Sequence, residues 1–219
     1  MKNFGLANQL LVAGAGAAFV FVASPSQAAV INISDFTGWQ SIGNVSLSNQ
    51  QAILSSGGVS DTAVESFLGL ANGALEAFNF QNVNNGSAIK NTITVQAGDV
   101  LTFDWQFQAG DYLPYNDFSF YSIGTSLNKL ADIRQVGNFG QIASQTSYTF
   151  TTAGTYTIGF GVVNTLDRFL DSSLTVRSSG SGGEPVPEPM TILGTLVGGA
   201  FGVALRHKKK QQQKATSKA

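Results

Sequence analysis

The sequence has no cysteine, one histidine and few charged residues. Without cysteine the chain forms no disulfide and carries out no thiol chemistry. The one histidine, His207, lies in a basic segment near the C-terminus. The rest of the chain therefore has no Ser-His-Asp triad, no Cys-His nucleophile pair and no histidine-ligated zinc.

Positive charge is also scarce in the middle of the chain. Between Val30 and Arg177 there are eleven acidic and five basic residues, although the formal net charge of the whole chain is only -1. Such a segment lacks the positive surface that phosphate backbones require, which argues against nucleic acid as a partner. Cations and neutral glycans remain open as ligands. The length of 219 residues suits one domain plus export segments, and we find no internal repeat.

Residues 1–28 have the features of a secretory signal peptide. Lys2 precedes an apolar region from Leu10 to Val22, and small residues precede the predicted cleavage site after Ala28. The mature chain would begin at Ala29 or Val30, with signal peptidase as the processing partner. A retained N-terminal anchor is the alternative interpretation.

The C-terminal end contains a motif, an apolar run and a basic cluster in succession, as a sorting signal does. A flexible Gly/Ser-rich linker, 178–185, precedes segment 186–210, and a polar tail, 211–219, follows it. Segment 186–210 contains the motif Pro187, Glu188, Pro189, an uncharged apolar run from Met190 to Leu205, and the basic residues Arg206, Lys208, Lys209 and Lys210. Counted from Pro189, the run has 17 residues, just enough for a membrane helix, and the basic cluster would lie in the cytoplasm.

This end resembles the PEP-CTERM sorting signal of bacteria in the order and spacing of its parts. The resemblance implies that an exosortase, a membrane-embedded transpeptidase-like enzyme, recognises the segment, cleaves near the motif and transfers the chain to the cell surface or to exopolysaccharide. It therefore predicts export to the cell envelope, cell surface or extracellular matrix. The tail from Gln211 to Ala219 is longer than the few basic residues that usually end the signal. An ordinary single-span anchor is the alternative.

Between these export segments, residues 29–177 show the alternation of β-strands. Leu101, Phe103, Trp105 and Phe107 alternate with polar residues and would share one buried face. Further strands are predicted at Val30–Ile33, Asn44–Leu47, Ile93–Val95, Asp117–Ile123, Ser147–Phe150, Thr155–Val163 and Ser172–Val176. Many short strands separated by turns predict an all-β fold, an antiparallel β-sandwich.

One short helix is expected within this domain. Thr62 and Glu65 have the spacing of a capping box, and Val64, Phe67, Leu68 and Ala71 share a helical face before Asn72-Gly73.

Several segments of the domain look like parts of uncharacterised ectodomains that precede this sorting signal in bacteria, including cyanobacteria. This resemblance implies a secreted, jelly-roll-like module and no particular activity. The segments are 86–90, 97–105, 115–120, 153–157 and 171–174.

Acidic and amide side chains gather in two predicted loops, and calcium is the cation that best suits such oxygen ligands. The candidate ligands are Asp111, Asn116, Asp117, Asp167 and Asp171. The same residue types also stabilise turns through bonds from side chain to backbone, which is the alternative reading. No other cofactor is predicted.

Aromatic residues surround Pro114, and Tyr112 and Tyr115 would offer rings for stacking on sugars if they lie on an exposed loop. Phe118 and Phe120 are instead expected in the core. Paired carboxylates could in principle hydrolyse glycans, but no spacing sets an acid against a base. The sequence therefore predicts an exported, non-enzymatic surface or matrix protein with a structural or adhesive role. A glycan-binding module, with exopolysaccharide as partner, is the alternative.

Overall fold

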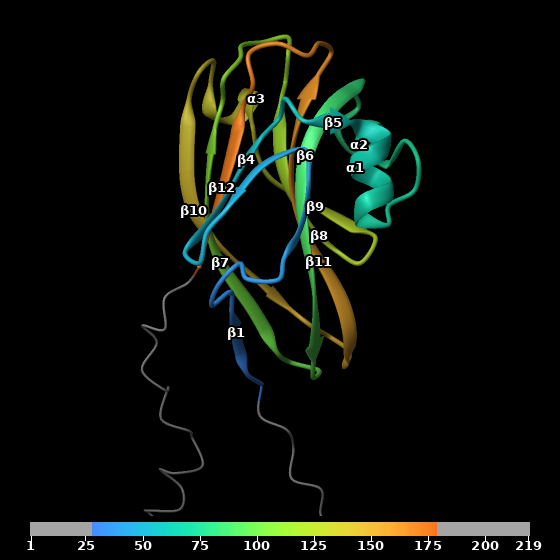
Figure 1. Ribbon diagram of the computed structural model, residues 1–219, viewed down its shortest axis with the longest axis vertical. Coiled ribbons are helices and arrows are strands. Elements are labelled where there is room, and N and C mark those ends of the chain that lie inside the picture. The colour runs from blue at the N-terminus through green and yellow to red at the C-terminus, as the bar shows by residue number, and fades with distance from the viewer. Residues whose placement is uncertain (1–27, 179–219) are drawn as a thin grey trace, which may run out of the picture.

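The computed structural model describes residues 28–178, and its strands form two six-stranded sheets (Figure 1). The strand order in the first sheet is β1-β7-β12-β4-β3, and β10 also pairs with β7. The strand order in the second sheet is β2-β6-β11-β8-β9, and β5 also pairs with β6. The first sheet contains β1 (Val30–Asn32), β3 (Asn44–Leu47), β4 (Gln51–Ser55), β7 (Val100–Gln108), β10 (Gln141–Thr149) and β12 (Ser173–Arg177). The second contains β2 (Gln40–Ile42), β5 (Val59–Ser60), β6 (Val83–Val95), β8 (Phe118–Ile123), β9 (Ser126–Asp132) and β11 (Gly154–Thr165).

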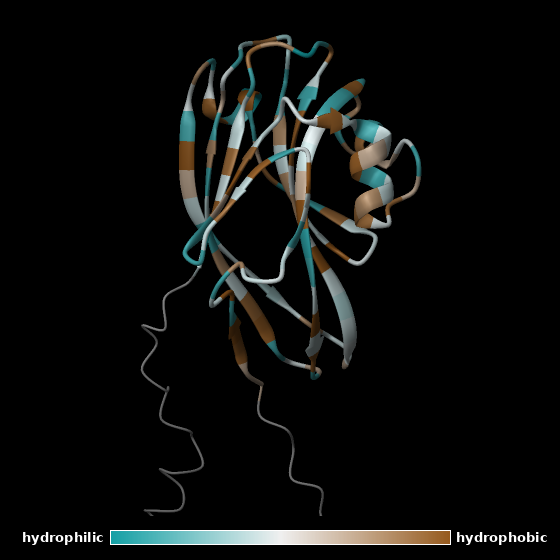
Figure 2. Ribbon diagram, viewed as in Figure 1, coloured by the Kyte–Doolittle hydropathy of each residue, from teal (hydrophilic) through white to brown (hydrophobic). Residues whose placement is uncertain are grey.

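The main core lies between the sheets. Leu101, Phe103, Trp105 and Phe107 of β7 are all at most 5% exposed, which confirms that they share one buried face. They pack against inward-facing residues of β11 such as Ile158 and Phe160. Bands of apolar and polar residues alternate along the strands in Figure 2, as expected where only one face of a sheet is buried.

A second, smaller core lies on the outer face of the second sheet, where two helices cover it. Helix α1 (Asp61–Leu68) and helix α2 (Ala74–Asn79) lie beside β6 in Figure 1. Val64 and Leu68 of α1 and Leu75 of α2 pack with Phe118 and Phe120 of β8. Because both of its faces are covered, β8 is buried along its whole length. The prediction that Phe118 and Phe120 lie in the core is confirmed.

The helices differ from the prediction in number and in their ends. Helix α1 is capped by Ser60, whose Oγ accepts from the backbone N of Ala63, so Thr62 is not the cap. It ends at Leu68 because Gly69 adopts a left-handed conformation, and Ala71 lies outside it. Helix α2 and helix α3 (Ile133–Val136) were not predicted, since six and four residues are too few to show a helical period.

The sandwich is also not fully antiparallel, because β1 pairs with β7 in parallel, Val30 opposite Val100. The two sheets with few helices are as the strand pattern predicted. No helix within residues 28–178 is long and apolar enough to cross a membrane. The predicted signal peptide and C-terminal membrane helix lie outside the described residues.

Candidate functional site

Four connections meet at one end of the sandwich, the upper end in Figure 1, and together they form what we call the loop end. They are residues 80–82 before β6, 109–117 between β7 and β8, 137–140 after α3, and 166–172 between β11 and β12. Hydrogen bonds join them in pairs. The backbone N of Phe139 donates to the carbonyl of Asp111 at 3.0 Å, and the N of Leu166 donates to the carbonyl of Asn82 at 2.9 Å. The four connections therefore hold one another in place.

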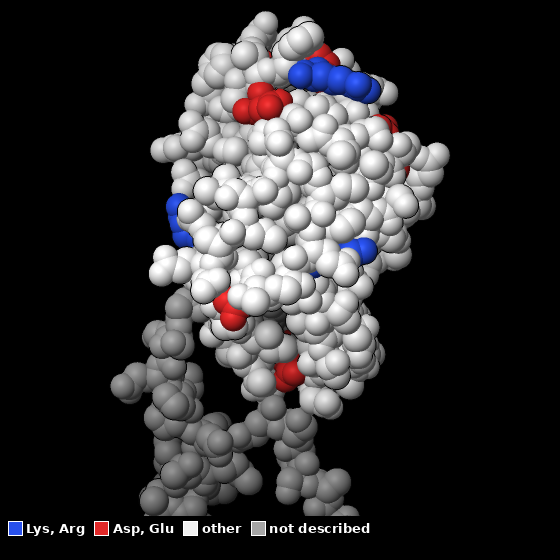
Figure 3. Space-filling view, in the orientation of Figure 1, with Lys and Arg blue, Asp and Glu red and all other residues white. Residues whose placement is uncertain are grey.

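The loop end exposes large apolar side chains. Of the ten large hydrophobic residues that are exposed in the described chain, seven belong to it: Phe80, Tyr112, Leu113, Phe139, Leu166, Phe169 and Leu170. Charged side chains of both signs lie at the same end in Figure 3, and the connection 166–172 itself contributes Asp167, Arg168 and Asp171. A large exposed apolar patch on a protein is typical of a site that binds a ligand or another protein.

Four of these residues have an uncommon backbone conformation. Phe80, Phe139, Leu166 and Leu170 have φ angles of 56°, 55°, 69° and 56°, and no other described residue except glycine has a positive φ. The left-handed region disfavours residues with a bulky side chain by about 1–2 kcal/mol. Such outliers concentrate at functional sites, where the surrounding structure maintains them.

The ring of Tyr112 contacts those of Tyr115 and Phe139, and we call these three rings the aromatic platform. The rings of Tyr112 and Tyr115 are perpendicular with centroids 5.5 Å apart, and those of Tyr112 and Phe139 are 6.0 Å apart. Tyr112 is 41% exposed and Phe139 58%, whereas Tyr115 is half-buried. The backbone N of Leu113 donates to Oδ1 of Asn138 at 3.0 Å, which fixes the two loops side by side.

A buried polar network lies beneath these loops, with Asp117 at its centre. Oδ1 of Asp117 accepts from the backbone N of Thr165 at 3.0 Å, and Oδ2 accepts from the hydroxyl of Ser172 at 2.7 Å. The Ser172 oxygen also accepts from the backbone N of Gly110. The pKa of Asp117 is raised to about 7: burial raises it most, the two hydrogen bonds lower it, and the charges of Asp111 and Asp167 raise it. The network joins the starts of β8 and β12 to the ends of β7 and β11.

The five candidate calcium residues each accept hydrogen bonds from the protein. Besides Asp117, Asp111 accepts from the N of Tyr112 and Asp167 from the N of Phe169. Asn116 accepts from the N of Arg134, and Asp171 accepts from Ser55 and Asn164. Oδ2 of Asp111 is buried without a partner in the described chain. Through these hydrogen bonds the five residues stabilise the loops. Calcium binding by them stays a prediction.

A different set of carboxylates comes together within the described residues. Oxygen atoms of Asp61, Glu65 and Glu76 lie within 4.8 Å of one another. Glu65 accepts from the backbone N of Gly73 and of Leu75, both at 2.9 Å, so it ties α1 to the start of α2. The pKa of Glu76 is raised, mainly by burial and also by Asp61 and Glu65. The sequence analysis missed this cluster, although Asp61 and Glu65 have the i, i+4 spacing of one helical face.

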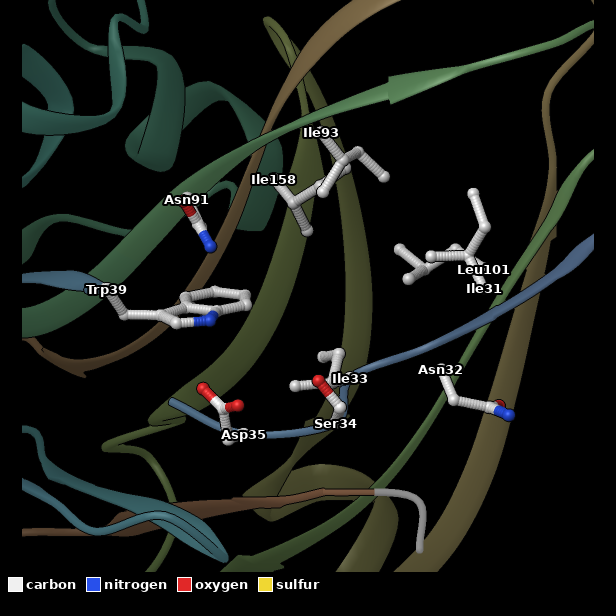
Figure 4. Close-up of a pocket in the computed structure, with 10 residues that line it drawn as sticks. All are labelled: Ile31, Asn32, Ile33, Ser34, Asp35, Trp39, Asn91, Ile93, Leu101 and Ile158. Carbon is white, nitrogen blue, oxygen red and sulfur yellow. The ribbon is translucent and has the colours of Figure 1, made fainter. Parts of the chain in front are cut away.

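A pocket of about 140 Å³ opens on the side of the sandwich, away from the loop end (Figure 4). Its apolar walls come from β1, β6, β7 and β11, and the segment 33–39 closes one side. The pocket is lined by Ile31, Asn32, Ile33, Ser34, Asp35, Trp39, Asn91, Ile93, Leu101 and Ile158. The sequence analysis did not single out Trp39, although it is one of only two tryptophans in the chain.

The sequence matches no family model and no curated protein. Solved structures with a distant similarity include three carbohydrate-binding proteins. TmCBM61, in complex with β-1,4-galactotriose, is 8% identical with a TM-score of 0.34, covering 66% of this chain and 87% of its own. A family 35 carbohydrate-binding module from an environmental isolate is 15% identical, with a TM-score of 0.28 over 50% and 75%. The N-terminal cellulose-binding domain of Cellulomonas fimi β-1,4-glucanase C is 10% identical, with a TM-score of 0.32 over 67% and 90%. At these scores they assign no ligand to any residue of this chain.

Proposed function

We propose that this protein is an exported surface protein that binds neutral glycans through the aromatic platform and thereby adheres to polysaccharide. The observation that carries the proposal is the exposed contact of Tyr112 with Phe139. A sugar ring presents an apolar C–H face that packs on an aromatic ring, while its hydroxyls bond to nearby polar groups. Ligand sites of this kind combine apolar surface with a few polar groups held in fixed positions.

The position of the platform supports an adhesive role. In Figure 1 the described chain begins at β1 and ends after β12 in the lower half of the domain, whereas the loop end lies at the top. In this proposal the segment 186–210 delivers the chain through an exosortase and holds or attaches its C-terminal side. The platform then points away from the attachment and toward the surrounding matrix.

The rigidity of the platform supports the binding of a glycan. Hydrogen bonds from Phe139 and Leu113 fix the two loops that carry it, so little conformational freedom is lost when a ligand binds. A preformed apolar surface of this kind suits glycan binding.

The test is binding of the full-length protein, in non-ionic detergent, to a panel of neutral and acidic polysaccharides in affinity gel electrophoresis. We expect retardation by at least one neutral polysaccharide, weakened about tenfold by Tyr112→Ala and by Phe139→Ala, since a buried aromatic contact of this kind contributes about 1.4 kcal/mol. Phe80→Ala is the matched control, because Phe80 is 91% exposed with a similar φ but lies outside the platform. Equal losses in all three variants, or no retardation by any polysaccharide, would refute the proposal.

A further inference from the structure

The side pocket combines aliphatic and polar lining residues: five of the ten are Ile or Leu, and Asn32, Ser34, Asp35 and Asn91 are polar. Ile93, Leu101 and Ile158 form part of the wall, and Leu101 and Ile158 are at most 2% exposed. An engineered cavity of about 150 Å³ lined by Leu, Ile and Phe binds benzene, so a pocket of about 140 Å³ has room for one compact ring or branched hydrocarbon group.

Trp39 forms the aromatic side of the pocket and is held firmly. Its ring centroid lies 5.3 Å from that of Phe36 and 5.8 Å from that of Phe160, and both of these phenylalanines are buried. In Figure 4 the indole extends toward the middle of the pocket. Because Phe36 and Phe160 hold the ring, it is presented to a ligand in one orientation. The face of tryptophan is the best aromatic surface for attracting a cation.

Asp35 supplies the only formal charge in the lining. Its Oδ1 accepts from the backbone N of Thr37 at 2.8 Å, and this turn fixes the direction of the side chain. In Figure 4 its carboxylate points toward the Trp39 ring. None of the ten lining residues is Lys or Arg. The charge of the pocket is therefore negative, and it complements a positive ligand.

The nearest described lysine does not cancel this charge. Lys90 lines a neighbouring polar groove that shares Asn91 with the pocket. Its ammonium donates to the carbonyl of Phe67 at 2.5 Å and lies 4.4 Å from the centroid of the Phe67 ring. Lys90 is thus directed toward α1, on the outer face of the second sheet, and away from Trp39.

We propose that this pocket binds a small alkylammonium group, with the hydrocarbon part on the aliphatic wall and the ammonium between Trp39 and Asp35. A compact hydrocarbon fills the apolar space, and the positive charge meets both the ring face and the carboxylate. An anionic ligand of the same shape would meet only repulsion at the rim. The site is independent of the aromatic platform, which lies at the loop end.

Three probes that share a cyclohexyl ring test this proposal: cyclohexylamine, cyclohexanol and cyclohexanecarboxylate. Each is titrated into the full-length Trp105→Phe variant, in which Trp39 is the only fluorophore of its kind. We expect saturable fluorescence changes with a Kd on the order of 1 mM for the amine, as suits a ligand of this size. The alcohol should bind about fivefold more weakly, because a partly exposed charge contributes modestly, and the carboxylate weaker still.

Substitution of the carboxylate provides the control. Asp35→Asn should remove the preference for the amine over the alcohol while leaving the affinity for the alcohol unchanged. Asp104→Asn removes the same charge from a half-buried site on β7, outside the pocket, and should leave the preference intact. Calorimetry on the unsubstituted protein repeats the three titrations without relying on any variant. A carboxylate that binds as well as the amine, an equal effect of Asp104→Asn, or no saturable binding of the amine would overturn the proposal.

Discussion

Asp117 should make the stability of the domain depend on pH in a way that one substitution removes. Its side chain is fully buried, and burial raises its pKa from 3.8 to about 7. A carboxyl group with a raised pKa in the folded state binds its proton more tightly there than in the unfolded chain. Its contribution to stability is therefore complete below pH 3.8, decreases as the pH rises to about 7, and is constant above that.

The size of the effect follows from the shift. A displacement of about three pKa units corresponds to about 4 kcal/mol, which is an upper estimate for the stability lost between pH 4 and pH 8. Asp117→Asn keeps one oxygen to accept from Thr165 and cannot ionise. The free energy of unfolding of the variant, minus that of the unsubstituted protein, should therefore rise by up to about 4 kcal/mol over this range.

Urea unfolding at several pH values and constant ionic strength measures this difference. Comparing two proteins at each pH is necessary because Asp99 and Asp132 have lowered pKa values and affect the total stability in the opposite direction. Asp104→Asn, which removes a half-buried carboxylate on β7 outside this network, is the control. If the difference for Asp117→Asn does not change with pH, the hydrogen bonds from Ser172 and Thr165 keep Asp117 ionised and the reasoning is wrong.

Three further predictions concern the other acidic groups and the C-terminal end. Glu76→Gln should raise the free energy of unfolding at pH 7, and less so at pH 4, because burial and the charges of Asp61 and Glu65 raise the pKa of Glu76; urea unfolding at both pH values checks this. Millimolar calcium should raise the thermal midpoint and a chelator should lower it, whereas an unchanged midpoint would leave the five candidate ligands with their loop hydrogen bonds only. The mature surface form should lack the basic cluster and tail, residues 206–219, by intact-mass measurement; a mass that retains them on most molecules would favour a plain anchor.

The sequence predicted those parts of the fold that depend on local alternation. In β7 every second residue is apolar, and these residues are buried, because a strand places alternate side chains on opposite faces. The pairing of strands was harder to predict from the sequence. Parallel pairing of Val30 with Val100 depends on how segments seventy residues apart meet, and nothing in either segment encodes it. The cap of α1 was misplaced by two residues because Ser60 and Thr62 are both good capping residues.

The candidate sites show the same difference between local and long-range information. Tyr112 and Tyr115 were found from sequence because they are close together in one predicted loop, but their partner Phe139 comes from another connection. The Trp39 pocket was missed because its walls come from four strands that are far apart in sequence. Likewise, Glu76 meets Asp61 and Glu65 only after the chain turns between α1 and α2. Sequence spacing identifies residues on one element, whereas these sites form between elements.

The loop end depends on the buried network below it for its shape. Four large residues there have positive φ angles, and each would relax to a more favourable conformation if its loop were free. The loops are held because Ser172 and Thr165 bond to Asp117, and these residues adjoin the connections that expose Leu166, Leu170 and Tyr112. A buried carboxyl group destabilises a fold unless hydrogen bonds satisfy it. The hydrogen bonds from Thr165 and Ser172 satisfy Asp117 and at the same time fix the loops. Burial in this network, beneath the exposed apolar residues, is the main cause of the raised pKa of Asp117.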